Sequence, residues 1–377
     1  MHWFVAAMLF ATATFAEAAP TDFHCDELQR FRDNDLGVEL RQLHRQLQLG
    51  QMALGFVDMS DPEQPRMATV EPPLREDLPY TNRYVASMAK MAILTTILKK
   101  DREHRDSNRP PLIRWRSDTG PQYQYLQKQV TEDDLIRMMR PSDNEASNKA
   151  IEVLGSSVSG AVHHCGRPNV RDETAKGMVL IQDTMASYGI NMTLGKAFSR
   201  DNSIRCKQNG TGEPVHVHGA TAEAVSCLLY GVHANRFPFS DDFRKVYCLP
   251  ESCGPPVDKL RAKEDAYKNM CSVSHYFKKA FSQDFERAQF GSPLSHLTPG
   301  ARICRKSGTW DIHQADAAFI DRGDGKRFIL TLISNQGMGN EEGDAVMQKV
   351  YEGVQSYMDR RDSMDMGTAA VPVSDTP

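Results

Sequence analysis

The pattern of apolar and polar positions predicts a helix and two strands at the start of the folded chain. Leucines recur at helical spacing from Asp26 to Leu49, and Gly50 ends that pattern. Two short apolar runs follow, Met52–Met59 and Met67–Val70, and the segment between them is rich in Asp and Pro, as in a hairpin turn. We therefore expect this part of the chain to form one helix and an antiparallel pair of strands.

In the middle of the chain, apolar residues recur at the spacing of helices. A long apolar pattern begins at Ser87 and ends in the cations Lys99 and Lys100, which suit the C-terminus of a helix. Asp172 is a plausible N-cap for one of the helices that follow. Further amphipathic helices are predicted at Thr131–Met139, Asn144–Leu154 and Asp172–Tyr188.

Strand patterns return near the C-terminus. The runs are Ala301–Lys306, Ala315–Asp321 and Arg327–Ser334, with a turn at Arg322–Gly325, and a helix is predicted at Met347–Asp359. We expect an α/β (α+β) fold with one antiparallel sheet built from both chain ends and an all-helical domain from the middle. A cleft between two such parts is a common place for a functional site.

The two ends of the chain lie outside the predicted fold. Trp3 to Phe15 is apolar or small, and Ala16-Glu17-Ala18 fits a signal-peptidase site, so residues 1–18 are a predicted signal peptide. An uncleaved N-terminal anchor is the alternative, although the run is short for a bilayer. The mature chain has no other long apolar run, so we expect a periplasmic or secreted protein with no stable membrane span. The polar tail at 360–377 is predicted to be disordered.

Composition narrows the choice of partners and compartment. The 45 basic and 49 acidic side chains give a net charge of -4, which does not favour binding to nucleic acid. Eight cysteines in an exported chain predict disulfides, but the sequence does not fix their pairing. A local bridge between Cys248 and Cys253 is one hypothesis, and buried free thiols are the alternative.

Three short motifs supply candidate chemistry, namely Ser87-Met88-Ala89-Lys90, Ser142-Asp143-Asn144 and Lys306-Ser307-Gly308. One helical turn places Ser87 and Lys90 on the same face. A serine hydroxyl becomes a useful nucleophile when a base takes its proton, and burial beside a second cation can make a lysine that base. The pair is therefore a candidate nucleophile and base at the start of a helix.

The other two motifs supply candidate partners for these groups. Ser142 can relay a proton to a leaving nitrogen, and Asn144 can hold a substrate amide. Lys306 and Ser307 offer a cation and a hydroxyl to a substrate carboxylate, and Gly308 lets the backbone approach a ligand closely. Asp143 is expected to satisfy backbone donors rather than to react.

The three motifs in this order resemble the signature of class A β-lactamases and penicillin-binding serine transpeptidases. Further likeness lies in Ser142–Asn148, in Leu294–Gly300 and in Ala220–Glu223. The resemblance covers Arg41 to Asp359 apart from a middle stretch. It implies one catalytic domain at 21–359, with a cysteine-rich insertion at about 237–285.

The resemblance also implies a mechanism. Ser87 attacks a lactam or peptide carbonyl, and the backbone N–H groups of Ser87 and Thr309 form the oxyanion hole. No cofactor or metal is implied, and we expect a monomer that binds a small β-lactam or a cell-wall peptide. His216-Val217-His218 and His163-His164-Cys165 hint at zinc, but no Asp-His pair follows at close spacing, so we expect no metal site.

Two departures from the family leave the fate of an acyl group open. The family's deacylating glutamate is expected near Gly195 to Asn202, which contains no Glu, and Asp201 or Glu213 is a possible substitute. The family's arginine on the strand after the third motif is also missing, with Gln314 and Ala315 near its place. Three functions therefore remain: β-lactam hydrolysis, a D-alanyl-D-alanine carboxypeptidase or transpeptidase, and a sensor that stays acylated.

Overall fold

The computed structural model describes residues 23–360 with gaps. The gaps are at 74–82, 121–127, 141, 165–166, 196–197, 199–205, 208–213, 216–217, 249–301, 311–312, 335–345 and 347–348. The predicted signal peptide, most of the predicted insertion and the predicted disordered tail lie outside the described residues. No described helix is both long and apolar enough to cross a membrane.

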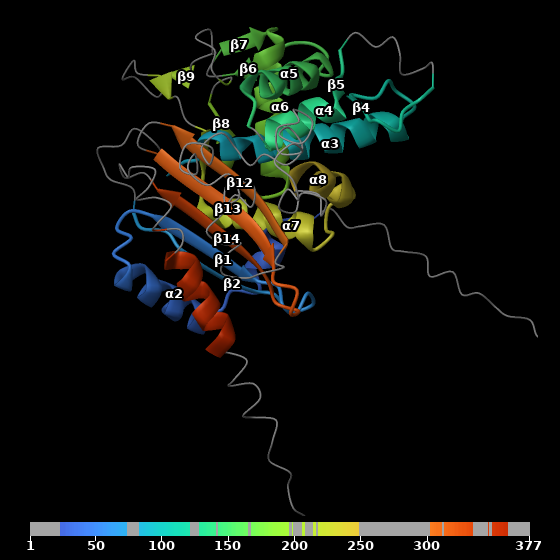
Figure 1. The fold of residues 1–377 in the computed structure, drawn as a ribbon. Helices are drawn as coiled ribbons and strands as arrows, with labels where there is room; N and C mark the ends of the chain where they lie inside the picture. The colour runs from blue at the N-terminus through green and yellow to red at the C-terminus, as the bar shows by residue number, and fades with distance from the viewer. Residues whose placement is uncertain are drawn as a thin grey trace, which may run out of the picture.

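One five-stranded antiparallel sheet contains strands from both ends of the chain (Figure 1). Its order is β12-β13-β14-β1-β2, so the pairing of β1 with β14 joins the two ends and β12 lies at an edge. This arrangement confirms the predicted sheet. The bounds are β1 Ala53–Asp58, β2 Arg66–Val70, β12 Arg302–Trp310, β13 His313–Asp321 and β14 Arg327–Ser334.

The first predicted helix is divided in two, which corrects the expectation of a single element. The chain forms α1 over Asp26–Gln29 and α2 over Asn34–Gln46. Between them Asp33 is extended, its N–H donates to the carbonyl of Met67 at 2.9 Å, and its carboxylate caps α2. The pairing with the sheet therefore interrupts a sequence that is helical in pattern.

The helix predicted from Ser87 begins with a short 3-10 turn and extends beyond its expected end. The turn η1 covers Ala86–Ala89, and α3 covers Lys90–Asp106. The helix does not end at Lys99 and Lys100, because Asp101 and Arg105 continue it with a side-chain hydrogen bond of 2.7 Å. Apolar side chains are buried around much of α3, which lies at the centre of the helical part.

The remaining predicted helices of the middle region are confirmed. Thr131 caps the first of them and Asp172 the third, in each case by accepting from a backbone N–H. These predicted helices are α4 Glu132–Met139, α5 Asn144–Ser156 and α6 Glu173–Ser187. Two further helices follow, α7 Ala222–His233 and α8 Ser240–Tyr247. Short strands lie among them: β3 Arg83–Tyr84, β4 Ile113–Arg114, β5 Val130–Thr131, β6 Val162–His164, β7 Arg167–Val170, β8 Met192–Leu194, β9 Cys206–Lys207, β10 Pro214–Val215 and β11 His218–Ala220.

The sheet has an apolar layer on each face. On one face α2 and a C-terminal helix at residues 349–360 pack together, with Leu40, Phe56 and Tyr351 buried between them and the sheet (Figure 1). On the other face α7 approaches so closely that an added Cβ on Gly55 would lie 2.5 Å from Ser226 Oγ. The helical part covers this second face, which leaves the edge at β12 beside the start of α3.

Among the described residues, two disulfides tie distant segments together. Cys25 bonds to Cys227 of α7, and Cys248, at the end of α8, bonds to Cys304 of β12. The hypothesis of a local bridge between Cys248 and Cys253 is therefore wrong, because the fold brings Cys304 closer than the sequence suggests. The predicted insertion begins with α8, whose Phe243 is fully buried in the core.

Candidate active site

The three sequence motifs meet at one hydroxyl group. Ser142 Oγ accepts a hydrogen bond from Lys90 Nζ at 3.0 Å and another from Lys306 Nζ at 3.0 Å. The first lysine opens α3, the serine lies in the turn before α5, and the second lysine lies on β12. The fold therefore joins residues from the helical part and from the sheet in a single polar network.

Lys90 is fully buried and bound to the second motif. Its Nζ also donates to the carbonyl of Ser142 at 2.6 Å and to Asn144 Oδ1 at 2.8 Å. Burial places the pKa of Lys90 well below its usual value, and the nearby positive charge of Lys306 lowers it further, while Asp143 opposes the shift. This shift favours the neutral amine, which is the form that can accept a proton.

Lys306 is the second buried amine of the network. Burial lowers its pKa to about 7; the carboxylate of Asp316 opposes this effect and the guanidinium of Arg305 adds to it. These two residues form a buried ion pair, in which Arg305 Nε donates to both carboxylate oxygens at 2.8 and 2.7 Å. Lys306 also donates to the carbonyl of Ser307 at 2.9 Å, so its Nζ is held between the strand and Ser142.

Ser87 is half-buried in η1 and follows a strained residue. Ala86 has a φ of 44°, and Ser142 has a φ of 63°, both in the left-handed region that costs a non-glycine residue about 1–3 kcal/mol. Within the described part of the chain, the hydrogen bonds of Lys90 go to Ser142 and Asn144 rather than to Ser87. Contacts to a nucleophile often tighten when substrate binds, so hydrogen bonds of Lys90 to Ser142 and Asn144 in this structure are compatible with proton transfer from Ser87.

Gly308 permits a close approach between β12 and the turn that carries Ser87. An added Cβ on Gly308 would lie 2.2 Å from the carbonyl oxygen of Val85 and 2.7 Å from the backbone nitrogen of Ser87. Thr309 follows in the same strand and is paired with Gln314 of β13. The backbones of the first and third motifs are therefore in direct contact at the edge of the sheet.

Asp143 organises the second motif. It caps α5 by accepting from the N–H of Ala146 at 3.1 Å, and it forms an ion pair with Arg137. Both interactions keep the carboxylate ionised, and its pKa is lowered although partial burial opposes this. The structural role expected for Asp143 is thus observed, and the cap places Asn144 at the first position of the helix.

Phe198 is a neighbour of Lys90 that the motifs did not reveal. The centre of its ring lies 4.8 Å from Lys90 Nζ, and its other neighbour is the imidazole of His218, stacked at 4.5 Å. Phe198 belongs to none of the three motifs, and an isolated phenylalanine gives no sequence signal of such a contact. His218, one of the residues that hinted at zinc, lies in this aromatic stack.

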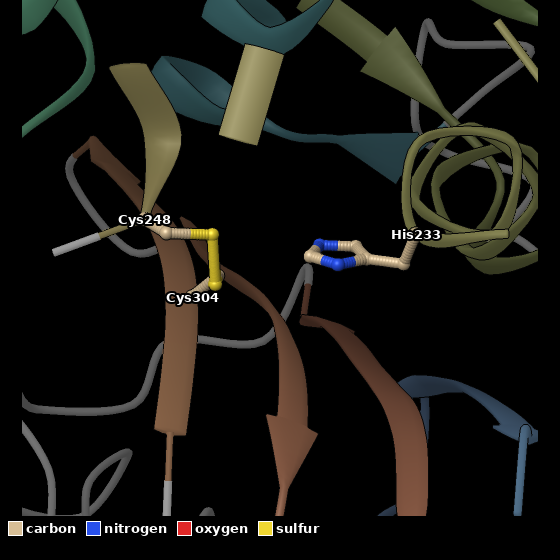
Figure 2. A group of neighbouring side chains, drawn as sticks. All are labelled: His233, Cys248 and Cys304. Carbon is tan, nitrogen blue, oxygen red and sulfur yellow. A yellow bond between two sulfur atoms is a disulfide. The ribbon is translucent and has the colours of Figure 1, made fainter. Parts of the chain in front are cut away.

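A cluster of potential metal ligands surrounds the disulfide between α8 and β12. Candidate ligand atoms of His233, Cys248 and Cys304 lie within 4.8 Å of one another (Figure 2). The two sulfur atoms are bonded to each other, so they are not the thiolates that bind zinc. The His233 ring stacks on Phe319 with centres 3.7 Å apart, and the cluster is best described as core packing around a disulfide.

Comparison with known proteins identifies the fold. No family model matches the chain, and no curated protein sequence matches it. One similar solved structure is a variant of the last common ancestor of Gram-negative bacteria β-lactamase class A, at 15% identity and a TM-score of 0.50, with 87% of this chain and 99% of that chain covered. Another is PBP-A, at 15% identity and a TM-score of 0.49, with 86% and 97% covered. The chain has the fold of the class A β-lactamases, as the motifs predict.

Proposed function

We propose that this chain is a serine hydrolase of the β-lactamase and transpeptidase type, which β-lactams acylate at Ser87. The observation that supports this proposal most strongly is the position of Ser142 Oγ between two buried lysine amines, each 3.0 Å away. Such a network can move a proton between a nucleophile and a leaving group without bulk water. The shared fold is consistent with this chemistry, although a fold can host many functions.

In the acylation step, Ser87 Oγ bonds to the carbonyl carbon of the lactam and the lactam C–N bond breaks. The Ser87 proton passes to neutral Lys90, and the network returns a proton through Ser142 to the leaving nitrogen. The lowered pKa of Lys90 makes the neutral amine available. The step needs no external base.

The third motif supplies the electrostatics of this step. The backbone N–H groups of Ser87 and Thr309 would hold the developing oxyanion, where a single donor typically contributes about 10²–10³ in rate. Lys306 and Ser307 would receive a substrate carboxylate, and Asn144 its amide side chain. The pKa of Lys306, at about 7, leaves a substantial fraction of cation at neutral pH.

A cell-wall peptide is the second candidate substrate. Because β12 lies at the edge of the sheet beside Ser87, alternate backbone groups of the strand face away from β13. An extended peptide can add to such an edge as an additional strand. A D-alanyl-D-alanine carboxypeptidase or transpeptidase would use the same nucleophile on a peptide carbonyl.

We place the protein in the periplasm or outside the cell. The two disulfides support an oxidising compartment. A β-lactam or a cell-wall peptide would be encountered there, and a cleaved signal peptide at residues 1–18 would deliver the chain.

The proposal is tested with a fluorescent penicillin, a chromogenic cephalosporin and an acylated D-alanyl-D-alanine peptide. Wild type should retain the fluorescent label through denaturing electrophoresis, and Ser87→Ala should not. Continuous cleavage of the cephalosporin supports a β-lactamase, and release of D-alanine supports a carboxypeptidase. Equal labelling or turnover by Ser87→Ala would contradict the assignment of the nucleophile.

A further inference from the structure

The C-terminal end of α8 is bound by a buried arginine that lies two residues before Ser142 in the chain. Arg140 donates to three carbonyls there: Nε to Val246 at 3.1 Å, and Nη2 to Lys245 at 2.9 Å and to Cys248 at 3.0 Å. Its side chain is 5% exposed, and burial lowers its pKa to about 10, so the guanidinium stays charged at neutral pH. A cation is favourable here because the last carbonyls of a helix carry partial negative charge.

The same end of α8 is joined to the sheet in two ways. Cys248 forms the disulfide with Cys304 of β12 (Figure 2). The buried hydroxyl of Tyr247 donates to the carbonyls of Cys304 at 3.0 Å and Ala317 at 3.2 Å, which lie on the neighbouring strands β12 and β13. Burial raises the pKa of Tyr247 well above its usual value, so the hydroxyl remains a donor. The end of α8 is therefore attached to β12 two residues before Lys306.

These contacts form a closed ring that passes through the candidate site. The chain connects Ser142 to Arg140, which binds the end of α8. That end is attached to Cys304, and β12 connects Cys304 to Lys306. The ring closes where Lys306 Nζ donates to Ser142 Oγ at 3.0 Å. Because only two residues separate each anchor from its functional group, the end of α8 restricts the spacing of the serine and the lysine.

The backbone of Ser142 gives this ring a physical task. Its φ of 63° lies in the left-handed region, and such a conformation persists only where the surrounding structure holds it. Arg140 anchors the chain on one side of Ser142, and Asp143 caps α5 on the other. A strained turn held from both sides can present its hydroxyl group in one position.

We propose that Arg140 and Tyr247 are positioning residues for the acylation of Ser87, because together they hold Ser142 at hydrogen-bonding distance from Lys306. The inference rests on the proposed function and adds to it two residues outside the three motifs. Both act through α8 rather than on the substrate. Since α8 begins the predicted insertion, this part of the chain would contribute to the site.

The rate of acylation tests this inference. Labelling by a fluorescent penicillin is followed at a temperature well below the unfolding midpoint of every variant. Tyr247→Phe, which removes one oxygen atom from a buried ring, should lower the second-order rate about 10-fold, and Arg140→Met should lower it about 10²-fold. The double variant should lose clearly less than the product of the two single effects, because either change alone releases the same spacing.

Arg244→Met is the matched control. Arg244 lies on α8 and also donates to a carbonyl near the end of a helix, that of Val232 in α7 at 2.6 Å, but it is not part of the ring. This variant loses a comparable arginine and should be labelled at the wild-type rate. Equal slowing by Arg244→Met would overturn the inference, because the effect would then be one of general destabilisation.

The other outcomes are also decisive. Tyr247→Phe labelled at the wild-type rate would contradict the inference, and this comparison stands even if Arg140→Met does not fold. Single effects that multiply in the double variant would show that the two residues do not act through one ring. If wild type is not labelled at all, the proposed function fails and the inference fails with it. A labelled wild type with unaffected variants contradicts the inference alone.

Discussion

Replacing Gly308 with alanine would insert a methyl group into the contact between β12 and η1. All three of its nearest neighbours would be backbone atoms: Val85 O at 2.2 Å, Ser87 N at 2.7 Å and Met88 N at 2.8 Å. Backbone atoms cannot rotate aside as a side chain can. Reaching an ordinary contact of about 3.4 Å would require the strand and the turn to separate by about 1 Å.

A separation of this size should affect both stability and acylation. Overpacking costs about 1–3 kcal/mol, and a misplacement of about 1 Å at a reacting centre can lower a rate about 10²-fold. We expect Gly308→Ala to lower the second-order rate of labelling by a fluorescent penicillin by about 10²-fold, with a lower thermal unfolding midpoint. The displaced backbone of Ser87, one of the proposed oxyanion donors, is the physical reason.

Gly37→Ala is the matched control for this substitution. Gly37 lies in α2, and an added Cβ would be 3.4 Å from the flexible end of Arg41, an ordinary contact. This variant should keep the wild-type rate of labelling and gain about 0.5–1 kcal/mol of stability. If Gly308→Ala were labelled at the wild-type rate with an unchanged unfolding midpoint, the tight approach inferred at β12 would be wrong.

Two further predictions concern the charge of Lys306 and the tether of its strand. Because burial lowers the pKa of Lys306 to about 7, its cation is lost as pH rises, so the second-order acylation rate with a carboxylate-bearing penicillin should fall between about pH 6 and about pH 9. Lys306→Arg, which stays charged, should remove that fall, and a flat wild-type profile would contradict the role of the cation. Replacing the pair Cys248 and Cys304 with serine should slow acylation more than replacing Cys25 and Cys227, because Cys304 lies two residues before Lys306. The loop-entropy model gives the reverse order for stability: losing the Cys248–Cys304 disulfide, with a sequence separation of 56, costs about 4 kcal/mol, and losing Cys25–Cys227, with a separation of 202, costs about 5 kcal/mol. Equal effects of the two replacements on the rate of acylation would contradict the role of the Cys248–Cys304 disulfide in holding β12.

The sequence predicted the elements whose evidence is local. Helical spacing located α4, α5 and α6, and the predicted cap at Asp172 depends on a residue within one turn of the helix. The strands β1 and β14 were found by their apolar pattern, and their pairing confirms that the sheet is built from both chain ends. Local periodicity is a reliable guide where burial and propensity agree.

The predictions from sequence were wrong where contacts with distant segments determine the local structure. The interruption between α1 and α2 depends on a hydrogen bond from Asp33 to Met67, across the boundary between helix and sheet. The partner of Cys248 is Cys304, 56 residues away, rather than the nearer Cys253. Neither contact has a signature within a few residues of the positions involved.

The candidate site likewise contains residues that the sequence predicts and one that it does not. The three motifs identified Lys90, Ser142 and Lys306 because their residue types and order are informative, and the fold brings all three together. Phe198 was missed because its contact with Lys90 depends on Asn148, 50 residues earlier in the chain. An apolar side chain that shapes a polar site is recognised from its neighbours in space.

Locating a covalent adduct tests the central claim most directly. The protein is incubated with benzylpenicillin, digested, and its peptides are analysed by tandem mass spectrometry, with Ser87→Ala treated in parallel. The account predicts a single penicilloyl group on the peptide that contains Ser87, assigned to that residue by fragmentation, and no adduct on the variant. An adduct on another residue, an equal adduct on Ser87→Ala, or no adduct on wild type would contradict the account.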